Sequence, residues 1–574
     1  MPLRQPILQR LLLLSIIGFL TLIAIGSLCY LCSDYTDVAQ WYLSLNDCFY
    51  LKELWQQRYF TPFVKDQGNY FAVIALLIAL LGNAYIVYNW RRIQLFIAST
   101  TSTPRFNSGW IWYIAVLSFA VLAWYWGMQQ TPASGDELLS VVHCAALPSF
   151  QTIAYYMLPN NHLYFNLLNG FLLHATHLDA LQTGRFISMI AYLFVVATAF
   201  SWFSGVLPNR MWALIAVVPF AFGFTTWAFG FQARGYEAQL CCAWLSFVLL
   251  QKYLQSPDRK IALLIALFNM MGFAFVLSFL YYFIVQMIYV LLVQAYRRKI
   301  DLVFWQYQLF GMMAVFLLYA PALCFSGLQA ITQNEYVKPL NELTNVAFLA
   351  IASEKTKYFI NAIFSFLIHE NHWLNFILFA SPLFLFFSKQ NKHRQLAVFY
   401  IVLWLSWWSI CWSMKRFPFN RNMIIHHSLS LAIVLYTYAV CLFKVLTKWA
   451  AMAWRSKLSI ALYVLPLVYF VQHQWKWNKE HVCTSLYFMD VRDIKREYQN
   501  DIAATIPSNA SIAFARERYC MVYYAQKNYT QAHTCIEGNE DYFVTIAQDT
   551  LPVGIAKNYR LVKRGIGNDI YQHR

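Results

Sequence analysis

The sequence is poor in charged side chains. Asp, Glu, Lys and Arg make up 12% of its 574 residues, which is about half the share of a typical soluble protein. Hydrophobic residues make up 60% and aromatic residues 18%. This composition excludes an ordinary soluble protein and indicates that most of the chain lies in a membrane.

Motifs of nucleotide-using and hydrolytic enzymes are also missing. The sequence contains no GxxxxGK[ST] phosphate loop, no GxGxxG, no HExxH and no GxSxG. These absences weaken the enzyme classes that depend on those motifs. We also find no inverted internal repeat, which many secondary transporters have, and no low-complexity segment.

Long apolar runs separate the sparse charges. A helix of about 20 apolar residues crosses the hydrocarbon core of a bilayer, so we expect a polytopic, all-α membrane protein with roughly thirteen spans. We expect these spans at 11–31, 70–89, 110–127, 186–205, 212–229, 238–254, 261–277, 279–296, 305–325, 373–388, 396–414, 428–443 and 458–473.

The formal net charge of +17 concentrates in short loops. By the positive-inside rule, these basic loops face the cytoplasm and contact anionic lipid, which excludes the nucleic-acid partner that such a charge would otherwise suggest. Arg4 and Arg10 precede the first span, which we interpret as a retained signal anchor. The N-terminus is then cytoplasmic, and an odd number of spans places the C-terminus outside, in the periplasm if the membrane is a bacterial inner membrane.

Three regions follow from this pattern. Residues 1–109 carry two N-terminal spans with an outer loop, residues 110–473 form the main membrane domain, and residues 474–574 form a small soluble α/β domain. In that domain, the runs 511–515, 521–524 and 542–546 are rich in strand-forming residues.

Most of the twelve cysteines lie in or beside apolar runs, where we expect inert packing. In the C-terminal domain, Cys520 and Cys535 could form a disulfide if that domain is extracytoplasmic. Cys483 would then have no cysteine partner within the domain.

An acidic pair, Asp136 and Glu137, directly follows the third span. A carboxylate at a helix mouth can act as a general base toward a hydroxyl group within hydrogen-bond reach. The alternative is the solvated start of a loop. Either way, ionisable groups at a membrane surface are costly to desolvate and are candidates for function.

Two further polar groups fall on the predicted outer face. The segment 159–169 includes Asn161 and His162 and is typical of either a site wall or an N-capped interfacial helix. The segment 232–237 includes Arg234, Tyr236 and Glu237, and there the arginine either binds a phosphate or caps a helix end.

A fourth group, residues 415–427, places three cations on the outer face and ends in a pair of histidines. This runs against the positive-inside rule, and an anionic ligand at Arg416 and Arg421 would explain it; contact with acidic groups or lipid is the alternative. His174 and His177 share a helical spacing that a divalent metal could use, but no fourth ligand is identifiable and no metal site is assigned.

In this order and spacing, the segments resemble the GT-C superfamily of membrane glycosyltransferases. They are Gly135-Asp136-Glu137, then Asn160 to Asn169, then Arg185-Phe186-Ile187-Ser188, then Ala233-Arg234-Gly235-Tyr236. The similarity is to the branch of protein mannosyltransferase-like and aminoarabinose transferase-like enzymes. It is clearest over residues 110–300, and topology extends it to residue 473.

The resemblance implies a polyprenyl-phosphate sugar as donor and a lipid, glycan or protein as acceptor, joined on the outer face with inversion. It implies that Asp136 is the catalytic base, with Glu137 orienting it or acting as base itself. Arg234 and Tyr236, with Arg416 and Arg421, would bind the donor phosphate. His162, Asn161 and Glu237 would line the acceptor side.

The chain departs from the family pattern in three ways. Nothing in it matches the additional loops of the eukaryotic mannosyltransferases, so a protein acceptor is not favoured over a lipid or glycan acceptor. Two spans precede the one that matches the family's first, and Leu163 stands where many relatives have proline after the histidine. A transporter or flippase of lipid-linked glycan is the alternative function, although the spans hold few of the ionisable groups that a transport path needs. A non-catalytic scaffold would not explain the polar groups gathered on one face.

Overall fold

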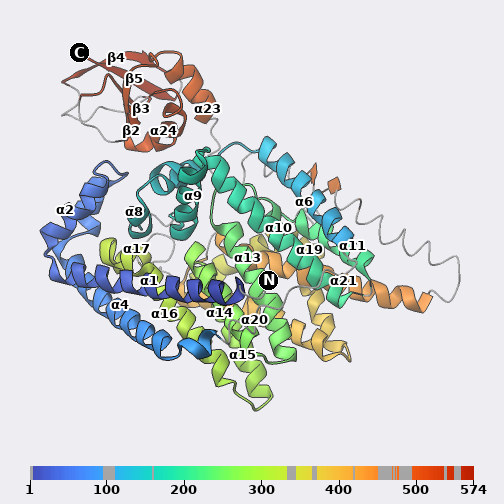
Figure 1. Cartoon of the computed structure of the whole chain (residues 1–574). Coiled ribbons are helices and arrows are strands. Elements are labelled where there is room, and N and C mark those ends of the chain that lie inside the picture. The colour runs from blue at the N-terminus through green and yellow to red at the C-terminus, as the bar shows by residue number, and fades with distance from the viewer. Residues whose placement is uncertain are drawn as a thin grey trace.

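A computed structural model shows a predominantly helical molecule. It describes residues 4–94, 110–157, 161–207, 209–332, 344–364, 372–417, 420–449, 494–529, 531–534, 539–547, 557–565 and 567–574, with 468, 472, 473, 475 and 476. A helical body carries a small mixed α/β domain at the C-terminal end of the chain (Figure 1). The polytopic fold class predicted from the apolar runs is therefore confirmed.

Eight helices of the described residues are long and apolar enough to cross a membrane. Each overlaps one of the predicted spans. They are α1 (Arg4–Cys32), α4 (Pro62–Tyr88), α6 (Trp110–Gln130), α10 (Ala180–Val206), α15 (Phe279–Tyr296), α16 (Leu302–Phe325), α20 (Asn391–Met414) and α21 (Ile424–Trp449).

Other predicted spans form shorter or more polar helices. These are α11 (Arg210–Ala221) with α12 (Phe224–Trp227), α13 (Tyr236–Gln255), α14 (Arg259–Phe275), and α19 (His372–Ala380) with η3 (Ser381–Phe387). Helix α13 is buried along most of its length, so its polar residues meet protein instead of lipid. The predicted span 458–473 falls largely outside the described residues.

The two N-terminal spans pack on the main body. Helix α1 packs along α4, and α4 packs along α16 (Figure 1). Gly68 permits this close approach, because a Cβ there would stand 2.2 Å from the Tyr30 hydroxyl oxygen. That hydroxyl donates a hydrogen bond to the Cys324 carbonyl at 3.0 Å, which joins α1 to α16.

Short helices cover the end of the bundle that carries the candidate site. They are α2 (Tyr35–Leu45), α3 (Lys52–Leu54), η1 (Trp55–Tyr59), α7 (Gly135–Ser140), η2 (Val141–Ala145), α8 (Ser149–Ala154), α9 (Leu163–Thr176) and α17 (Gly327–Thr332). Stacked aromatic rings hold several of them together, with Tyr42 between Trp55 and Phe325 at centroid distances of 4.6 and 5.1 Å. Helix α18 (Asn345–Phe364) and η4 (Asn420–Met423) lie in predicted outer loops.

The C-terminal domain contains a five-stranded sheet in the order β2-β1-β3-β5-β4. Strand β1 pairs in parallel with β2 and β3, whereas β3, β5 and β4 pair antiparallel. The elements are α23 (Ile494–Glu497), η6 (Tyr498–Ala503), β1 (Ser511–Phe514), η7 (Arg516–Arg518), α24 (Tyr519–Ala525), β2 (Gln531–His533), β3 (Tyr542–Ile546), β4 (Tyr559–Arg564) and β5 (Asn568–His573).

One predicted strand of this domain is wrong. Residues 521–524 form the middle of helix α24 and do not form a strand. Strands β1 and β2 are parallel neighbours, so the chain between them must cross over, and a helix is the usual connection. Met521, Val522 and Ala525 bury one face of that helix in the domain, which a run of apolar and aromatic residues does not distinguish from a buried strand.

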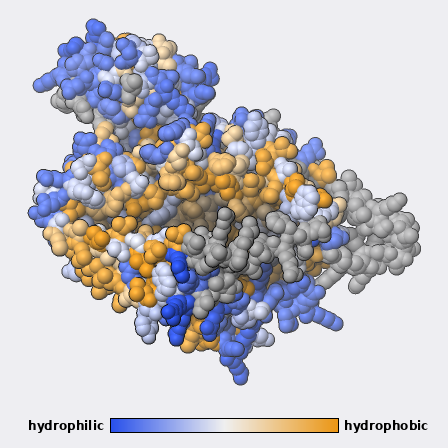
Figure 2. Space-filling model, in the orientation of Figure 1, coloured by the Kyte–Doolittle hydropathy of each residue, from blue (hydrophilic) through white to orange (hydrophobic). Residues whose placement is uncertain are grey.

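The hydropathy of the surface separates the two parts of the molecule. In Figure 2 the C-terminal domain is mostly hydrophilic, while the body beneath it carries broad hydrophobic areas on the side shown. Exposed large apolar residues are frequent on α1 and α4, as in Leu22, Leu77 and Leu81. Lipid is the solvent that such faces require.

Candidate active site

The acidic pair lies at the start of helix α7. The Ser134 side chain caps this helix by accepting a hydrogen bond from the Glu137 backbone N–H, and Glu137 Oε2 accepts one from the Ser134 backbone N–H at 3.0 Å. This reciprocal capping box fixes the first turn. Asp136 therefore stands at a defined position in that turn, beside the helix N-terminus.

Glu137 is a buried anchor. Its side chain is 1% exposed and accepts hydrogen bonds from Arg185 Nε and Nη2 at 3.0 and 3.1 Å. Glu137 Oε1 also accepts the Ala233 backbone N–H at 2.8 Å. Since both oxygens hold structural partners, Glu137 joins three segments: α7, α10 and the loop before α13.

Asp136 is the accessible member of the pair. Its side chain is 28% exposed, and Oδ2 lies 2.6 Å from Nη1 of Arg234, whose own side chain is only 3% exposed. The Arg234 guanidinium also lies over the Tyr236 ring, 5.0 Å from its centroid. The structure thus brings together Asp136, Arg234 and Tyr236, three residues of the predicted site.

One face of helix α10 positions this arrangement. Arg185 binds Glu137, while the Ser188 hydroxyl donates to the carbonyls of Gln232 and Arg234 at 2.5 and 3.3 Å. Gly184 leaves room for the same loop, because a Cβ there would stand 2.7 Å from the Ala233 Cβ. The Arg185 to Ser188 segment therefore sets the geometry of the loop that carries Arg234.

His162 joins the group from the start of α9. Its Nδ1 accepts the Gly235 backbone N–H at 2.8 Å, which leaves the ring proton on Nε2. The ring meets Tyr236 edge-on at a centroid distance of 4.6 Å. A Cβ on Gly235 would stand 2.9 Å from Nδ1, so a larger residue would push His162 away.

Asn161 and Glu237 are buried behind this group. The Asn161 amide donates to the carbonyls of Thr152 and Tyr155, and its oxygen accepts from Asn166 at 2.8 Å. These contacts give Asn161 a role in shaping the turn. Glu237, in the first turn of α13, is fully buried, and neither oxygen has a hydrogen-bond partner among the described residues.

The two outer arginines of the fourth group are not joined to the acidic pair by any contact described in the structure. Arg416 follows α20 near Tyr281 of α15, with a buried Nη1 that lacks a hydrogen-bond partner within the described part of the chain. Arg421 lies in η4, and its side chain is outside the described residues.

The C-terminal domain supplies residues that the sequence did not reveal as part of the site. A Cβ on Gly135 would stand 3.4 Å from the Cys520 sulfur and 3.6 Å from the Tyr519 hydroxyl oxygen. Burial, Cys520 and Asp136 together raise the pKa of Tyr519, so its hydroxyl stays protonated. No local motif could identify Tyr519, because it reaches the site from 383 positions along the chain, counted from Asp136 to Tyr519.

His143 and Tyr50 connect this domain to the outer helices. The His143 ring lies 4.7 Å from the Tyr50 ring, and its Nε2 lies 3.4 Å from the Tyr519 carbonyl oxygen. Burial lowers the pKa of His143 to about 4, although the hydrogen bond to Tyr519 opposes this shift. At neutral pH the imidazole is therefore uncharged and packs as an aromatic ring.

A second set of contacts holds the domain at the start of α10. The Tyr523 hydroxyl donates to Asp179, with both carboxylate oxygens within 2.9 Å, and Lys527 Nζ lies 2.8 Å from Oδ2. Burial alone would raise the pKa of Asp179, but the hydrogen bonds from Lys527 and Tyr523 hold it below its ordinary value. Asp179 is thus an ionised docking point.

The cysteines are arranged differently from the prediction. Cys520 is not disulfide-bonded, so the predicted pairing of Cys520 with Cys535 is wrong; its thiol donates a hydrogen bond to the Gly135 carbonyl oxygen at 3.7 Å, and Cys535 lies outside the described residues. Cys48, in the first outer loop, is disulfide-bonded instead. Cys29 and Cys32, a Cys-x-x-Cys pair at the end of α1, are both free.

Within the described residues, no group of three or more His, Cys, Asp or Glu side chains could hold a metal ion. His174 Nδ1 lies 2.6 Å from the Gly170 carbonyl oxygen, and His177 ends α9 with a positive φ of 55°. Asp179 is engaged by the C-terminal domain. Because α9 ends before His177, the two histidines do not continue on one face of a helix, as the spacing for a metal site would require.

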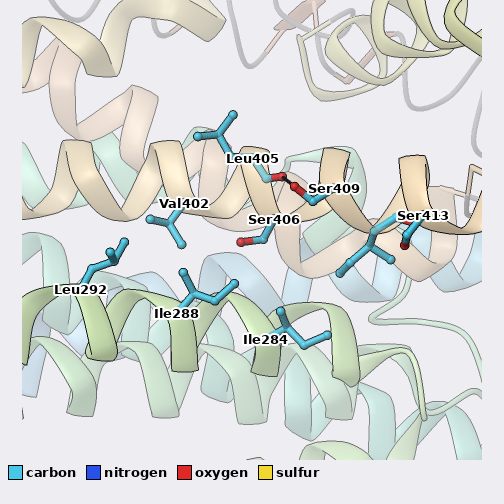
Figure 3. A pocket seen from close by; sticks show the side chains of 9 residues that line it. Ile284, Ile288, Leu292, Val402, Leu405, Ser406, Ser409 and Ser413 are labelled. Atoms are coloured by element: carbon cyan, nitrogen blue, oxygen red, sulfur yellow. Dashed lines mark hydrogen bonds between the residues drawn. The ribbon is translucent and has the colours of Figure 1, made fainter. Parts of the chain in front are cut away.

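The structure also contains two apolar cavities in the helical body. One, of about 740 Å³, lies between α1, α4 and α16, with Tyr30 and Tyr164 in its wall. The other, of about 430 Å³, is a groove in which Ile284 and Ile288 of α15 face Val402 and Ser406 of α20 (Figure 3). Both suit hydrocarbon better than a polar ligand.

Comparison with known proteins gives a structural relationship but no sequence relationship. No protein-family model matches the chain, and no curated protein matches it in sequence. ArnT from Cupriavidus metallidurans bound to undecaprenyl phosphate aligns with a TM-score of 0.53 and 10% identity, over 81% of this chain and 98% of that chain. ArnT in the apo state aligns over the same shares with a TM-score of 0.46 and 10% identity.

The alignment with the lipid-bound ArnT spans nearly all of that protein. Together with the polytopic helical body and the mixed sheet at the C-terminal end, it establishes the architecture. This chain has the membrane-protein fold of ArnT.

Proposed function

We propose that the protein is a membrane glycosyltransferase that transfers a sugar from a polyprenyl-phosphate donor to a lipid, glycan or protein acceptor on the outer face of the membrane. The shared fold supports this class, and the ArnT structure of that fold binds undecaprenyl phosphate. The observation that carries the proposal is the pair formed by Asp136 and Arg234, an accessible carboxylate beside a buried guanidinium.

The two groups suit the two charges that develop during transfer. Asp136 takes the proton of the acceptor hydroxyl, whose oxygen then attacks the anomeric carbon of the donor. The bond from that carbon to the phosphate oxygen breaks, and the polyprenyl phosphate leaves with the electron pair. Arg234 stabilises the leaving phosphate. A single displacement of this kind inverts the anomeric configuration.

The ion pair also suggests an order of binding. In the structure Arg234 Nη1 donates a hydrogen bond to Asp136 Oδ2 and so occupies that carboxylate oxygen. A donor phosphate is a strong partner for an arginine and competes for the same guanidinium. Donor binding therefore frees Asp136 to accept the acceptor proton, so that the base becomes active only when a donor is present.

The surrounding residues take supporting roles in this proposal. Tyr236 holds the Arg234 guanidinium against its ring, and His162 fixes the loop of Gly235 through Nδ1 and lines the acceptor side. Asn161 and Glu237 form the wall behind them. Arg416 and Arg421 remain candidates for contacts with the donor phosphate, separate from the Asp136 group.

Two observations support an outward orientation of the site. Disulfides persist in oxidising compartments, which favours an extracytoplasmic position for Cys48 and its loop. The Tyr50 ring of the same loop contacts Tyr519 of the C-terminal domain at 5.6 Å, so loop and domain lie on one side. With this loop on the extracytoplasmic side, helix α1 begins on the cytoplasmic side of the inner membrane.

The proposal is tested by a transfer assay in nanodiscs with polyprenyl-phosphate sugars as donors and envelope extracts as acceptors. Wild type should form a glycosylated product, and Asp136→Asn should lower the rate by about 100-fold or more. Movement of the donor across the bilayer with no new glycosidic bond would favour the flippase function instead. Full activity of Asp136→Asn would reject this base.

A further inference from the structure

A third cavity lies between the first outer loop and the C-terminal domain. It has a volume of about 490 Å³ and is lined by residues 47–54 and Gln56 of the loop, and by Arg516 and Thr534 of the domain. We call it the loop–domain cavity. Its volume is within the range of small-ligand sites.

The lining of this cavity mixes polar and apolar side chains, and its charges balance. Two carboxylates, Asp47 and Glu53, face the same space as two cations, Lys52 and Arg516. Such a set offers donors and acceptors of both kinds without a net charge. It therefore suits a neutral ligand rich in hydroxyl groups, such as a glycan, and does not suit a hydrocarbon chain or a polyanion.

Tyr50 connects the loop–domain cavity to the candidate site. Its side chain lines the cavity and binds Arg516 by a hydrogen bond. Its ring also contacts Tyr519, at a centroid distance of 5.6 Å, and the Tyr519 hydroxyl lies beside Gly135, next to Asp136. Two successive aromatic contacts thus link the cavity to the helical turn that carries the proposed base.

The cavity wall is held in place from several sides. The Tyr155 hydroxyl donates to the Tyr50 carbonyl at 2.7 Å, and the Trp55 indole donates to the Phe325 carbonyl at 2.8 Å. Leu51 adopts a left-handed backbone with a φ of 64°, and Cys48 is disulfide-bonded. A fixed loop of this kind offers a preorganised binding surface, which lowers the entropic cost of binding.

We propose that the loop–domain cavity is the subsite for the glycan portion of the acceptor, and that Lys52 and Arg516 hold its hydroxyl groups. This rests on the proposed function, and it specifies the acceptor as a glycan. The C-terminal domain then has a direct task, because it forms one wall of the subsite and places Tyr519 beside Asp136.

The experiment uses the full-length protein in nanodiscs and separates binding from turnover. Two acceptor preparations are used: a delipidated, water-soluble glycan fraction of the cell envelope, and a lipid-linked glycan fraction. Binding of each is measured without donor, and transfer and donor hydrolysis by water are measured with a radiolabelled polyprenyl-phosphate sugar. The variants are Lys52→Ala and Arg516→Ala, with Arg560→Ala as the matched control.

Arg560 is an exposed arginine of the same domain, on β4 at the opposite edge of the sheet from β2. Lys52→Ala and Arg516→Ala should each weaken glycan binding and raise the acceptor KM by about tenfold, while donor hydrolysis stays within twofold of wild type. Arg560→Ala should change neither quantity. The fraction that is bound identifies the acceptor as a free or a lipid-linked glycan.

The outcomes also distinguish the two proposals. Glycan binding that depends on Lys52 and Arg516, in a protein with neither transfer nor hydrolysis, would reject the transferase but retain the subsite. Transfer whose acceptor KM is the same in all three variants would retain the transferase and overturn the subsite. Loss of donor hydrolysis together with loss of glycan binding would show that the alanine variants damage the protein. The conservative Arg516→Lys and Lys52→Arg variants then decide: the subsite is retained if they bind glycan and overturned if they do not.

Discussion

Asp136 and Glu137 are adjacent in sequence and opposite in environment. Asp136 reaches the surface beside Arg234, whereas Glu137 is enclosed by Arg185, Ala233 and Ser134. The sequence predicts a functional carboxylate pair, with Asp136 as base and Glu137 either orienting it or acting as base itself. The partners that divide them lie 48 and 96 residues farther along, at positions that only the tertiary structure brings close.

This difference predicts opposite effects for two matched substitutions. Glu137→Gln leaves Arg185 buried without a counter-ion, and breaking a buried ion pair from one side costs about 3–5 kcal/mol. We expect a clear loss of thermal stability in detergent, measured by intrinsic fluorescence. Asp136→Asn, at an accessible position, should melt near wild type while losing transfer. Equal melting temperatures for Glu137→Gln and wild type would show that Glu137 is not a structural anchor.

Among the elements, helix α10 has the largest influence on the site. It presents Gly184, Arg185 and Ser188 to the loop that carries Arg234. The apolar run predicted this span at 186–205, and the structure extends it to Ala180–Val206. A long apolar run predicts such a helix because it lies in lipid, but the residues at its N-terminal end contact α7 and the Arg234 loop, and hydrophobicity does not predict them.

Gly184 provides the test at this scale. A Cβ at position 184 would stand 2.7 Å from the Ala233 Cβ, so Gly184→Ala should push the loop away and stretch the Asp136–Arg234 pair. Overpacking of this kind costs about 1–3 kcal/mol, and we expect a lower kcat/KM in the transfer assay. Gly205→Ala, on the same helix with nothing within 4 Å, is the control. It should leave activity unchanged, and equal losses in both variants would point to a general effect on α10.

The same lesson applies to the elements that the sequence did not predict. The pattern of apolar residues in 521–524 fits a strand and a helix equally well. These residues form a helix because β1 and β2 pair in parallel and the chain between them must cross over. Helix α18 lies in a segment expected to be a loop, and it carries Glu354, Lys355 and Lys357. Charge in a segment argues against a membrane span, but it does not argue against a helix.

For the whole molecule, the position of the C-terminal domain is the main finding that sequence patterns did not provide. The sequence predicts a small soluble α/β domain and no contact between it and the candidate site. In the structure its helix α24 packs on α7, and the apolar core of the domain includes Leu138 and Val141 of the membrane part. The soluble domain and the candidate site are therefore one structural unit.

Docking of the domain can be weakened at Tyr523. Tyr523→Phe removes the hydroxyl that donates a hydrogen bond to Asp179. A hydrogen bond to a charged group contributes about 1.5–3 kcal/mol to stability. We expect faster hydrogen exchange in α24 and at the start of α10, and slower transfer. Tyr542→Phe, which removes a hydroxyl contact within the sheet at Gln572, is the control. Exchange that rises only in the sheet would contradict this docking point.

His143 makes the same docking sensitive to pH. Its pKa is lowered by burial to about 4 in the folded protein, against an ordinary value of about 6.5. At a pH between these two pKa values, the His143 imidazole is protonated when it is exposed in the undocked state and neutral when it is buried in the docked state. Falling pH therefore favours the undocked state. The stability contributed by neutral His143 is fully present above pH of about 6.5 and is lost toward pH of about 4.

We therefore expect hydrogen-exchange protection of α24 to be constant above neutrality and to fall as the pH decreases from about 6.5. A His143→Gln variant has no titrating group at this position and should show a flatter profile over the same range, even if its docking is weaker at pH 7. Asp179 acts in the same direction but at lower pH, because its pKa lies below its ordinary value of about 3.9. A loss of protection confined to pH below about 4 would assign the pH response to Asp179 and would exclude His143 as its source.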